Sequence, residues 1–372
     1  MNAVVPEVAA QPAASEPAGY TRAMTTERLI GAASAGPQEE QTNWALRPAR
    51  LEEYVGQPEL IERLRIAITA GKQRAEPVEH ILLHGPPGLG KTTLAHVIAA
   101  EMGCKAHTTS GPALVRGTDL VACLTKLEQG DVLFIDEIHR LPIAVEEFVY
   151  PAMEDFRIDV TVDSGLHART VQIRCKPFTL IGATTRAGLL SAPLRSRFGL
   201  THHLRYYDQK EILSILVRSS RLLGVEAAAR DGLEAIAARS RGTPRIANRL
   251  LRRVRDYAQV KGDGAISPKI VDLALDLEGV DHLGLDELDR SYMRTIARVY
   301  HGGPVGLETV AATMNEDAGT LEDVVEPYLL QVGFLARTRR GRALTQAGAD
   351  HLGVKIRLAP SDDGSEAGLF KG

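Results

Sequence analysis

The chain has 372 residues, 44% of them hydrophobic, and a formal net charge of −3. This length predicts two or three domains of an ordinary globular protein, and the near-neutral charge does not indicate a uniformly basic nucleic-acid binder. No apolar run approaches the roughly 18 residues that cross a bilayer. The N-terminus lacks a basic start with an apolar core, and the three cysteines lack metal-ligand spacing. We therefore expect a cytoplasmic protein with reduced thiols.

The first 43 residues are rich in Ala, Pro, Glu, Gly and Ser and have little periodic pattern. This composition predicts a disordered N-terminal extension. From Trp44 the sequence becomes dense. Leu60, Leu64 and Ile68 recur at helical spacing, which predicts a helix that ends at Gly71.

A phosphate-binding loop is predicted at residues 85–92, which read Gly-Pro-Pro-Gly-Leu-Gly-Lys-Thr. The loop follows a strand expected at 80–84 and precedes a helix expected at 93–102 that stops at Gly103. Glycines such as Gly88 and Gly90 let backbone N–H groups turn toward phosphate oxygens. Lys91 would reach the β- and γ-phosphates, and the Thr92 hydroxyl would bind Mg²⁺. The loop therefore predicts a nucleoside triphosphate site.

Two carboxylates, Asp136 and Glu137, follow a second apolar strand expected at 132–135. Nucleotide hydrolysis uses such a pair, because one carboxylate holds the Mg²⁺ shell and the other deprotonates the attacking water. We assign these roles to Asp136 and Glu137, respectively.

A third strand, expected at 178–183, delivers Thr185, whose hydroxyl can contact the γ-phosphate or the water. Strands that alternate with helices predict an α/β domain with a parallel sheet. Arg195 and Arg197 follow at the expected edge of this domain, where an arginine more naturally serves the nucleotide of a neighbouring subunit. Arg245 opens a later helix and could reach back to the phosphates.

Three further units are predicted around this domain. Alternating residues at 157–174 predict a β-hairpin inserted between sheet strands. The helical pattern at 209–277 predicts a small helical domain. Helices at 288–300 and 307–314, and a third with a capping-box start at Thr320, lead into a hairpin. Pro327 should kink or restart that third helix.

The tip of that C-terminal hairpin is strongly basic. Its arginines are Arg337, Arg339, Arg340 and Arg342. Three helices followed by a basic hairpin predict a winged-helix module, in which guanidinium groups contact DNA phosphates. The alternative, a solvated surface turn, is favoured less because of the preceding helices.

These motifs together resemble the AAA+ ATPases. The loop at 85–92, the Asp136–Glu137 pair, Thr185, Arg197 and Arg245 are similar to the Walker A, Walker B, sensor 1, arginine finger and sensor 2 of that class. More narrowly, the chain resembles the RuvB family of branch-migration motors over residues 44–355. The resemblance is carried by residues 46–57, 84–93, 181–186, 190–199, 241–249 and 322–329.

The resemblance implies a hexameric ring that binds ATP and Mg²⁺ between subunits and pulls duplex DNA at Holliday junctions in recombination, repair and the SOS response. It implies a large ATPase domain at 44–207, a helical lid at 208–282, a winged helix at 283–355 and a flexible tail at 356–372. A RuvA-like junction-binding protein would dock on the hairpin at 157–174, and a RuvC-like resolvase would act with the motor.

The resemblance also assigns site residues. The nucleotide-binding residues would be Leu46, Arg47, Gly88, Gly90, Lys91, Thr92, Thr93, Glu154, Asp155, Phe156, Arg197, Tyr207 and Arg245. Glu154, Asp155 and Phe156 would lie near the subunit interface. Arg337, Arg340 and Arg342 would contact DNA. Where the family usually has proline, Arg339 adds a positive charge that should steepen the salt dependence of binding.

Other readings stay open at this point. A clamp-loader-like ATPase shares the nucleotide motifs but ends in a helical collar, against which the basic wing argues. An unfoldase or protease subunit lacks support, because no His-Glu-x-x-His sequence is present. A winged-helix regulator with a vestigial ATPase is disfavoured by the intact Lys91, Asp136 and Glu137.

Overall fold

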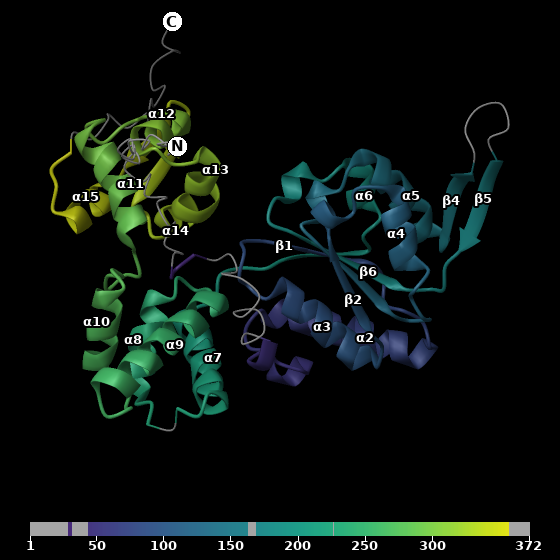
Figure 1. Cartoon of the computed structure of the whole chain (residues 1–372), viewed down its shortest axis with the longest axis horizontal. Coiled ribbons are helices and arrows are strands. Elements are labelled where there is room, and N and C mark those ends of the chain that lie inside the picture. Colours follow the sequence, from purple (N-terminus) through teal and green to yellow (C-terminus); the bar gives the residue numbers. More distant parts are fainter. Residues whose placement is uncertain (1–28, 32–43, 163–168, 226, 357–372) are drawn as a thin grey trace, which may run out of the picture.

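The computed structural model describes residues 29–31, 44–162, 169–225 and 227–356. The predictions of a disordered extension at 1–43 and a flexible tail at 356–372 fall almost wholly outside these residues. Figure 1 shows three bodies: a sheet domain that carries the hairpin, a helical domain and a C-terminal domain. Among the described helices, none is long and apolar enough to span a membrane.

The first body is built on a five-stranded sheet in the order β2-β3-β6-β1-β7, with all neighbours parallel. The three interior strands are almost entirely buried and apolar, as expected for strands covered on both faces. The parallel α/β sheet predicted from the sequence is therefore confirmed. The strands are β1 (Ile81–His84), β2 (Ala106–Ser110), β3 (Val132–Asp136), β6 (Thr179–Thr184) and β7 (Leu200–His203).

Helices cover both faces of this sheet (Figure 1). Alternate residues of β3 serve the two faces: Phe134 packs with α2 and α3, and Leu133 packs with α4 and α5. One layer contains α2 (Pro58–Arg74) and α3 (Lys91–Met102), and the other contains α4 (Gly117–Leu124), α5 (Ile143–Glu154) and α6 (Ala192–Ser196). Short 3₁₀ turns lie at η1 (Leu51–Glu53), η2 (Gly111–Ala113), η3 (Ile138–Arg140) and η4 (Ala187–Leu189).

One predicted helix end is wrong. Helix α2 continues past Gly71 to Arg74, and the left-handed Ala75, with φ of 54°, ends it. Gly71 is buried, and a Cβ there would lie 3.1 Å from the Glu76 carbonyl oxygen. This glycine therefore permits close packing inside the helix and does not stop it.

A β-hairpin projects from the far end of the sheet domain (Figure 1). Its strands, β4 (Arg157–Val162) and β5 (Arg169–Arg174), pair antiparallel, with Arg157 opposite Arg174. The turn at 163–168 lies outside the described residues. Ile158 is fully buried, so the base of the hairpin is anchored in the sheet domain.

The helical domain consists of α7 (Gln209–Leu222), α8 (Arg230–Arg239), α9 (Pro244–Lys261) and α10 (Pro268–Leu277). Helix α9 buries Ile246, Leu250 and Val254 on one face. Much of its arginine-rich run is partly or fully exposed on the other face. Helix α7 starts at a capping box formed by Asp208 and Glu211.

The C-terminal domain has its own core. Its elements are α11 (Glu287–Arg298), α12 (Leu307–Met314), α13 (Ala318–Thr320), the π-helical turn η5 (Leu321–Val325), α14 (Glu326–Gln331), β8 (Leu335–Thr338), β9 (Gly341–Leu344) and α15 (Gln346–Leu352). Strands β8 and β9 form the predicted basic hairpin. The predicted capping start at Thr320 is wrong, because Asp317 caps α13 by accepting the Thr320 N–H at 2.7 Å. Pro327 lies in the first turn of α14, where the helix restarts.

Candidate functional site

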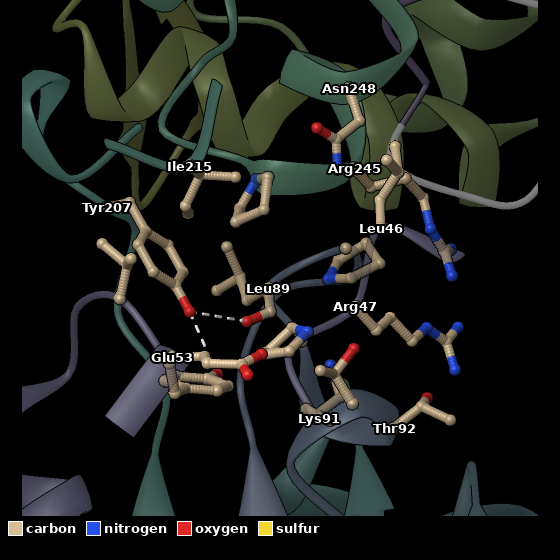
Figure 2. A pocket seen from close by; sticks show the side chains of 18 of the residues that line it. Leu46, Arg47, Glu53, Leu89, Lys91, Thr92, Tyr207, Ile215, Arg245 and Asn248 are labelled. Atoms are coloured by element: carbon tan, nitrogen blue, oxygen red, sulfur yellow. Dashed lines mark hydrogen bonds between the residues drawn. The ribbon is translucent and has the colours of Figure 1, made fainter. Parts of the chain in front are cut away.

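A cavity of about 340 Å³ lies where the sheet domain meets the helical domain (Figure 2). It brings together most of the predicted nucleotide-site residues from segments far apart in the sequence. These are Leu46, Arg47, Gly88, Gly90, Lys91, Thr92, Thr93, Asp136, Glu137, Thr185, Tyr207 and Arg245.

The loop at 85–92 has the backbone that glycine permits. Gly85 and Gly90 have φ of +140° and +98°. A Cβ at Gly85 would also lie 2.5 Å from the Leu204 carbonyl oxygen. Gly90 precedes α3, whose first N–H groups have no partner within the helix. The loop and this helix start therefore form an anion-binding end that faces the cavity.

Lys91 is the buried cation of this site, with 7% of its surface exposed. Its Nζ donates to the carbonyl oxygens of Gly85 at 2.8 Å and Pro86 at 2.9 Å. Burial lowers the pKa of Lys91 to about 8, although the carboxylates of Asp136 and Glu137 oppose the shift. An anionic ligand beside Lys91 would favour its charged form.

This lowered pKa predicts pH-dependent nucleotide binding. Lys91 is charged below pH 8 and loses its proton above it, whereas bound phosphates favour the charged form. We expect the Kd for ATP to rise about tenfold between pH 7 and pH 9. Equilibrium titration with a fluorescent ATP analogue across this range measures the effect. The Lys91→Ala variant should bind weakly with a flat profile, and an equally steep profile in that variant would assign the titration to another group.

Asp136 lies at the carboxyl end of β3 and accepts the Glu137 N–H at 2.9 Å. Burial raises the pKa of Asp136, and the neighbouring Glu137 charge adds to the shift. A divalent cation would offset both effects. The described residues contain no cluster of three or more His, Cys, Asp or Glu side chains that could hold a metal. The Thr92 hydroxyl and the Asp136 carboxylate fit a Mg²⁺ site of another kind, in which the ion binds one or two protein oxygens and several phosphate oxygens.

The carboxylate of Glu137 contacts two neighbours at the end of the sheet. Its Oε2 accepts from the Thr185 hydroxyl at 3.3 Å and lies 3.2 Å from His139 Nδ1. His139 Nδ1 also lies 2.8 Å from Thr184 Oγ1. The sequence analysis did not assign His139 or Thr184 to the site. The sequence feature that could have predicted His139 is its position two residues after the acidic pair.

Two tyrosines close the cavity on the side of the helical domain. The Tyr207 hydroxyl donates to the Leu89 carbonyl oxygen at 3.2 Å and lies 3.0 Å from the Tyr54 hydroxyl (Figure 2). Burial raises the pKa of Tyr54 to about 12 and raises that of Tyr207 further. Tyr207 also donates its N–H to Gly242 at 2.9 Å. Tyr207 therefore links the phosphate-binding loop to Gly242 of the helical domain. Tyr54 was not predicted from the sequence.

Arg245 comes from the first turn of α9 in the helical domain and lies at the cavity with Asn248 (Figure 2). Its charge contributes to lowering the pKa of Lys91. The placement fits an arginine that reports nucleotide state to the helical domain.

Four predicted nucleotide residues do not line this cavity. Arg197 lies 4.4 Å above the Tyr150 ring, and its Nε is 3.0 Å from Glu154 Oε1. Asp155 pairs with Arg157 at 3.3 Å, and Phe156 packs against Phe178. Within one subunit these residues do not reach the cavity, so their predicted role requires a neighbouring subunit.

The wing arginines are arranged differently from one another. Arg339 and Arg340 are exposed at the tip, whereas the guanidinium groups of Arg337 and Arg342 turn back toward the fully buried Glu326. Arg337 Nε donates to Glu326 at 2.9 Å, and Arg342 Nε donates at 2.8 Å. Burial alone would raise the pKa of Glu326, but the hydrogen bonds from Arg342, Tyr292 and Arg337 hold it below its ordinary value. Two of the three predicted DNA contacts are therefore partly neutralised.

Comparison with known proteins gives consistent matches along the chain. Three family models match in series: the Holliday junction DNA helicase RuvB P-loop domain at 46–204, the RuvB AAA lid domain at 207–281 and the RuvB C-terminal winged helix domain at 282–353. The matches agree with the three bodies of the structure.

Whole-chain relatives agree with the family models. A "Holliday junction branch migration complex subunit RuvB" of Desulfosudis oleivorans is 57% identical over 314 residues, which cover 84% of this chain and 91% of that protein. The solved Thermotoga maritima RuvB Holliday junction branch migration motor is 51% identical, with a TM-score of 0.77, and the match covers 84% of this chain and all of that one.

Proposed function

Because this chain belongs to the RuvB family of Holliday junction helicases, we propose that it hydrolyses ATP to pull duplex DNA through four-way junctions during recombination and repair. The cavity carries this proposal, because Lys91, Asp136, Glu137 and Thr185 converge there with Arg245 of the helical domain. The winged-helix match at 282–353 favours a DNA motor over a clamp loader with a helical collar.

We assign the hydrolytic roles from this geometry. Glu137 takes a proton from the attacking water, and the Thr185 hydroxyl orients the Glu137 carboxylate. Lys91 binds the β- and γ-phosphates. Thr92 and Asp136 would hold Mg²⁺, which neutralises charge that develops on the phosphate oxygens. The two tyrosines and the segment at 46–55 would enclose the base.

The subunits are proposed to form a hexameric ring in which Arg197 acts on the neighbouring nucleotide. Arg197 and Glu154 lie outside the cavity of their own subunit, and Arg197 is about one-fifth exposed. Asp155 and Phe156 belong to the same edge. An arginine supplied from the next subunit stabilises charge on the transferred phosphoryl group.

DNA contact is assigned to the wing, where Arg340 is one of the exposed cations. Arg340→Ala should weaken duplex binding about equally for all sequences, because phosphates carry no sequence information. The slope of log K against log salt should become about one unit less steep. Fluorescence anisotropy with two unrelated duplexes at several salt concentrations measures both effects. A loss confined to one duplex would argue for base contact instead.

A RuvA-like protein is proposed to dock on the β4–β5 hairpin, and a RuvC-like resolvase is proposed to follow. The projection of the hairpin away from the sheet supports the first assignment (Figure 1). ATP-dependent dissociation of a synthetic four-way junction, with and without a junction-binding partner and beside a linear duplex, tests the proposal. Stimulation by the partner on the junction supports it. Equal dissociation of junction and linear duplex would contradict it.

A further inference from the structure

A series of polar contacts starts at the carboxylate of Glu137 and leads out of the cavity. The Glu137 Oε2 atom lies 3.2 Å from His139 Nδ1. The same Nδ1 lies 2.8 Å from Thr184 Oγ1, which accepts the Arg186 N–H at 3.0 Å. Thr184 is fully buried. The backbone of Arg186 and the ring of His139 therefore contact the same Thr184 hydroxyl.

The side chain of Arg186 crosses to the C-terminal domain. Its Nη2 forms an ion pair with Asp323 Oδ2, 137 positions away along the chain. The two side chains are 42% and 51% exposed. Asp323 lies in the π-helical turn η5, a local distortion that is frequent at functional sites.

The same turn and the helix that follows it also hold the wing. Glu322, next to Asp323, lies 3.5 Å from Arg342 Nη2 and 3.8 Å from Arg337 Nη2. Glu326, three residues after Asp323, is the buried partner of both arginines. Residues 321–326 therefore contact the segment after β6 through Asp323 and Arg186, and the wing through Glu322 and Glu326.

We propose that Asp323 and Arg186 are positioning residues that couple DNA at the wing to the catalytic carboxylate Glu137 of the same subunit. DNA phosphates would compete with Glu322 and Glu326 for Arg337 and Arg342. Released from the arginines, residues 321–326 shift, and Asp323 carries the shift to Arg186. The inference rests on the functions proposed above for Glu137 and for the wing.

The exposure of the Arg186–Asp323 ion pair sets the expected size of its effect on the DNA response. An exposed ion pair changes an equilibrium by about fivefold at most. Its loss should therefore reduce the response of hydrolysis to DNA without abolishing hydrolysis itself. Coupling is reciprocal for binding, so nucleotide should alter duplex affinity through the same pair by the same factor.

The test measures ATP turnover of the full chain with and without a saturating linear duplex. For Asp323→Asn and for Arg186→Gln, we expect the DNA-induced change in turnover to shrink two- to fivefold, a range set by the exposure of the pair. Turnover without DNA should stay close to that of the unmodified chain. The exchanged pair, Arg186→Asp with Asp323→Arg, should restore the response, because the charges attract in either orientation. The control Glu316→Gln removes another exposed carboxylate of the same domain and should have no effect.

Two measurements distinguish a failure of the Arg186–Asp323 coupling from a failure of the proposed ATP-driven DNA motor. Turnover without DNA and the duplex Kd report on the ATP site and the wing, and neither should change more than about twofold in Asp323→Asn, because neither site contains this residue. If both are normal and the DNA response is as large as in the unmodified chain, the coupling role of the pair is refuted. An unmodified chain whose turnover does not respond to DNA would refute it too. If turnover without DNA is absent in the unmodified chain, the proposed function itself fails.

Discussion

Glu137→Gln is expected to lower ATP turnover by about 10²–10⁴-fold and to leave ATP binding intact. The amide cannot accept the proton of the attacking water, yet it keeps the shape of the carboxylate and can still accept from Thr185. Phosphate release in the steady state and ATP affinity by equilibrium titration measure the two effects.

Glu147→Gln is the matched control, since Glu147 is an exposed glutamate on the nearby α5. It should leave turnover unchanged. If Glu137→Gln kept turnover within tenfold of the unmodified chain, another group would have to act as the base.

Arg197→Ala is expected to lower turnover by about 10³–10⁵-fold, again with ATP binding retained. Its guanidinium lies over the Tyr150 ring and beside Glu154, outside the cavity of its own subunit. We attribute the loss to the nucleotide of the neighbouring subunit. Arg195→Ala is the control, because Arg195 is exposed two residues earlier and donates to the Ala187 carbonyl oxygen.

Mixed assemblies distinguish action on the neighbour from action within the subunit. A subunit with Arg197→Ala keeps Glu137, and a subunit with Glu137→Gln keeps Arg197. Where they adjoin in one order, a complete site forms, so mixing two inactive proteins should restore part of the turnover. Failure of every mixing ratio to restore turnover would place the function of Arg197 within its own subunit or outside catalysis.

The parts of the site that the sequence predicts well are contiguous motifs. Residues 85–92 specify their own backbone through glycine, and the apolar strands before Asp136 and Thr185 place these residues at the same edge of the sheet. The predicted helix at 307–314 coincides with α12. Such local patterns predict local structure without knowledge of tertiary contacts.

The parts that the sequence did not predict depend on tertiary contacts. Strands β2 and β7 are edge strands with polar residues, so they lack the apolar run that identified β1. His139 and Tyr54 enter the site through partners 45 and 153 residues away. Hydrophobic periodicity contains no information about such pairs.

The contacts of the wing arginines also depend on tertiary structure. The basic hairpin and the three helices before it predicted that these arginines contact DNA. A buried glutamate 11 and 16 residues earlier also holds Arg337 and Arg342. Removing both arginines would leave the charge on Glu326 without either of these cationic partners, which is costly in a buried place. These two arginines therefore link the stability of the domain to its contact with DNA.

The central claim is that ATP turnover in this cavity moves DNA at a junction. Its most direct test follows ATP hydrolysis and dissociation of a synthetic four-way junction in one sample, with the junction-binding partner present. We expect that the unmodified chain does both and that Glu137→Gln binds ATP and the junction but does neither. Dissociation at an undiminished rate by Glu137→Gln would contradict the claim.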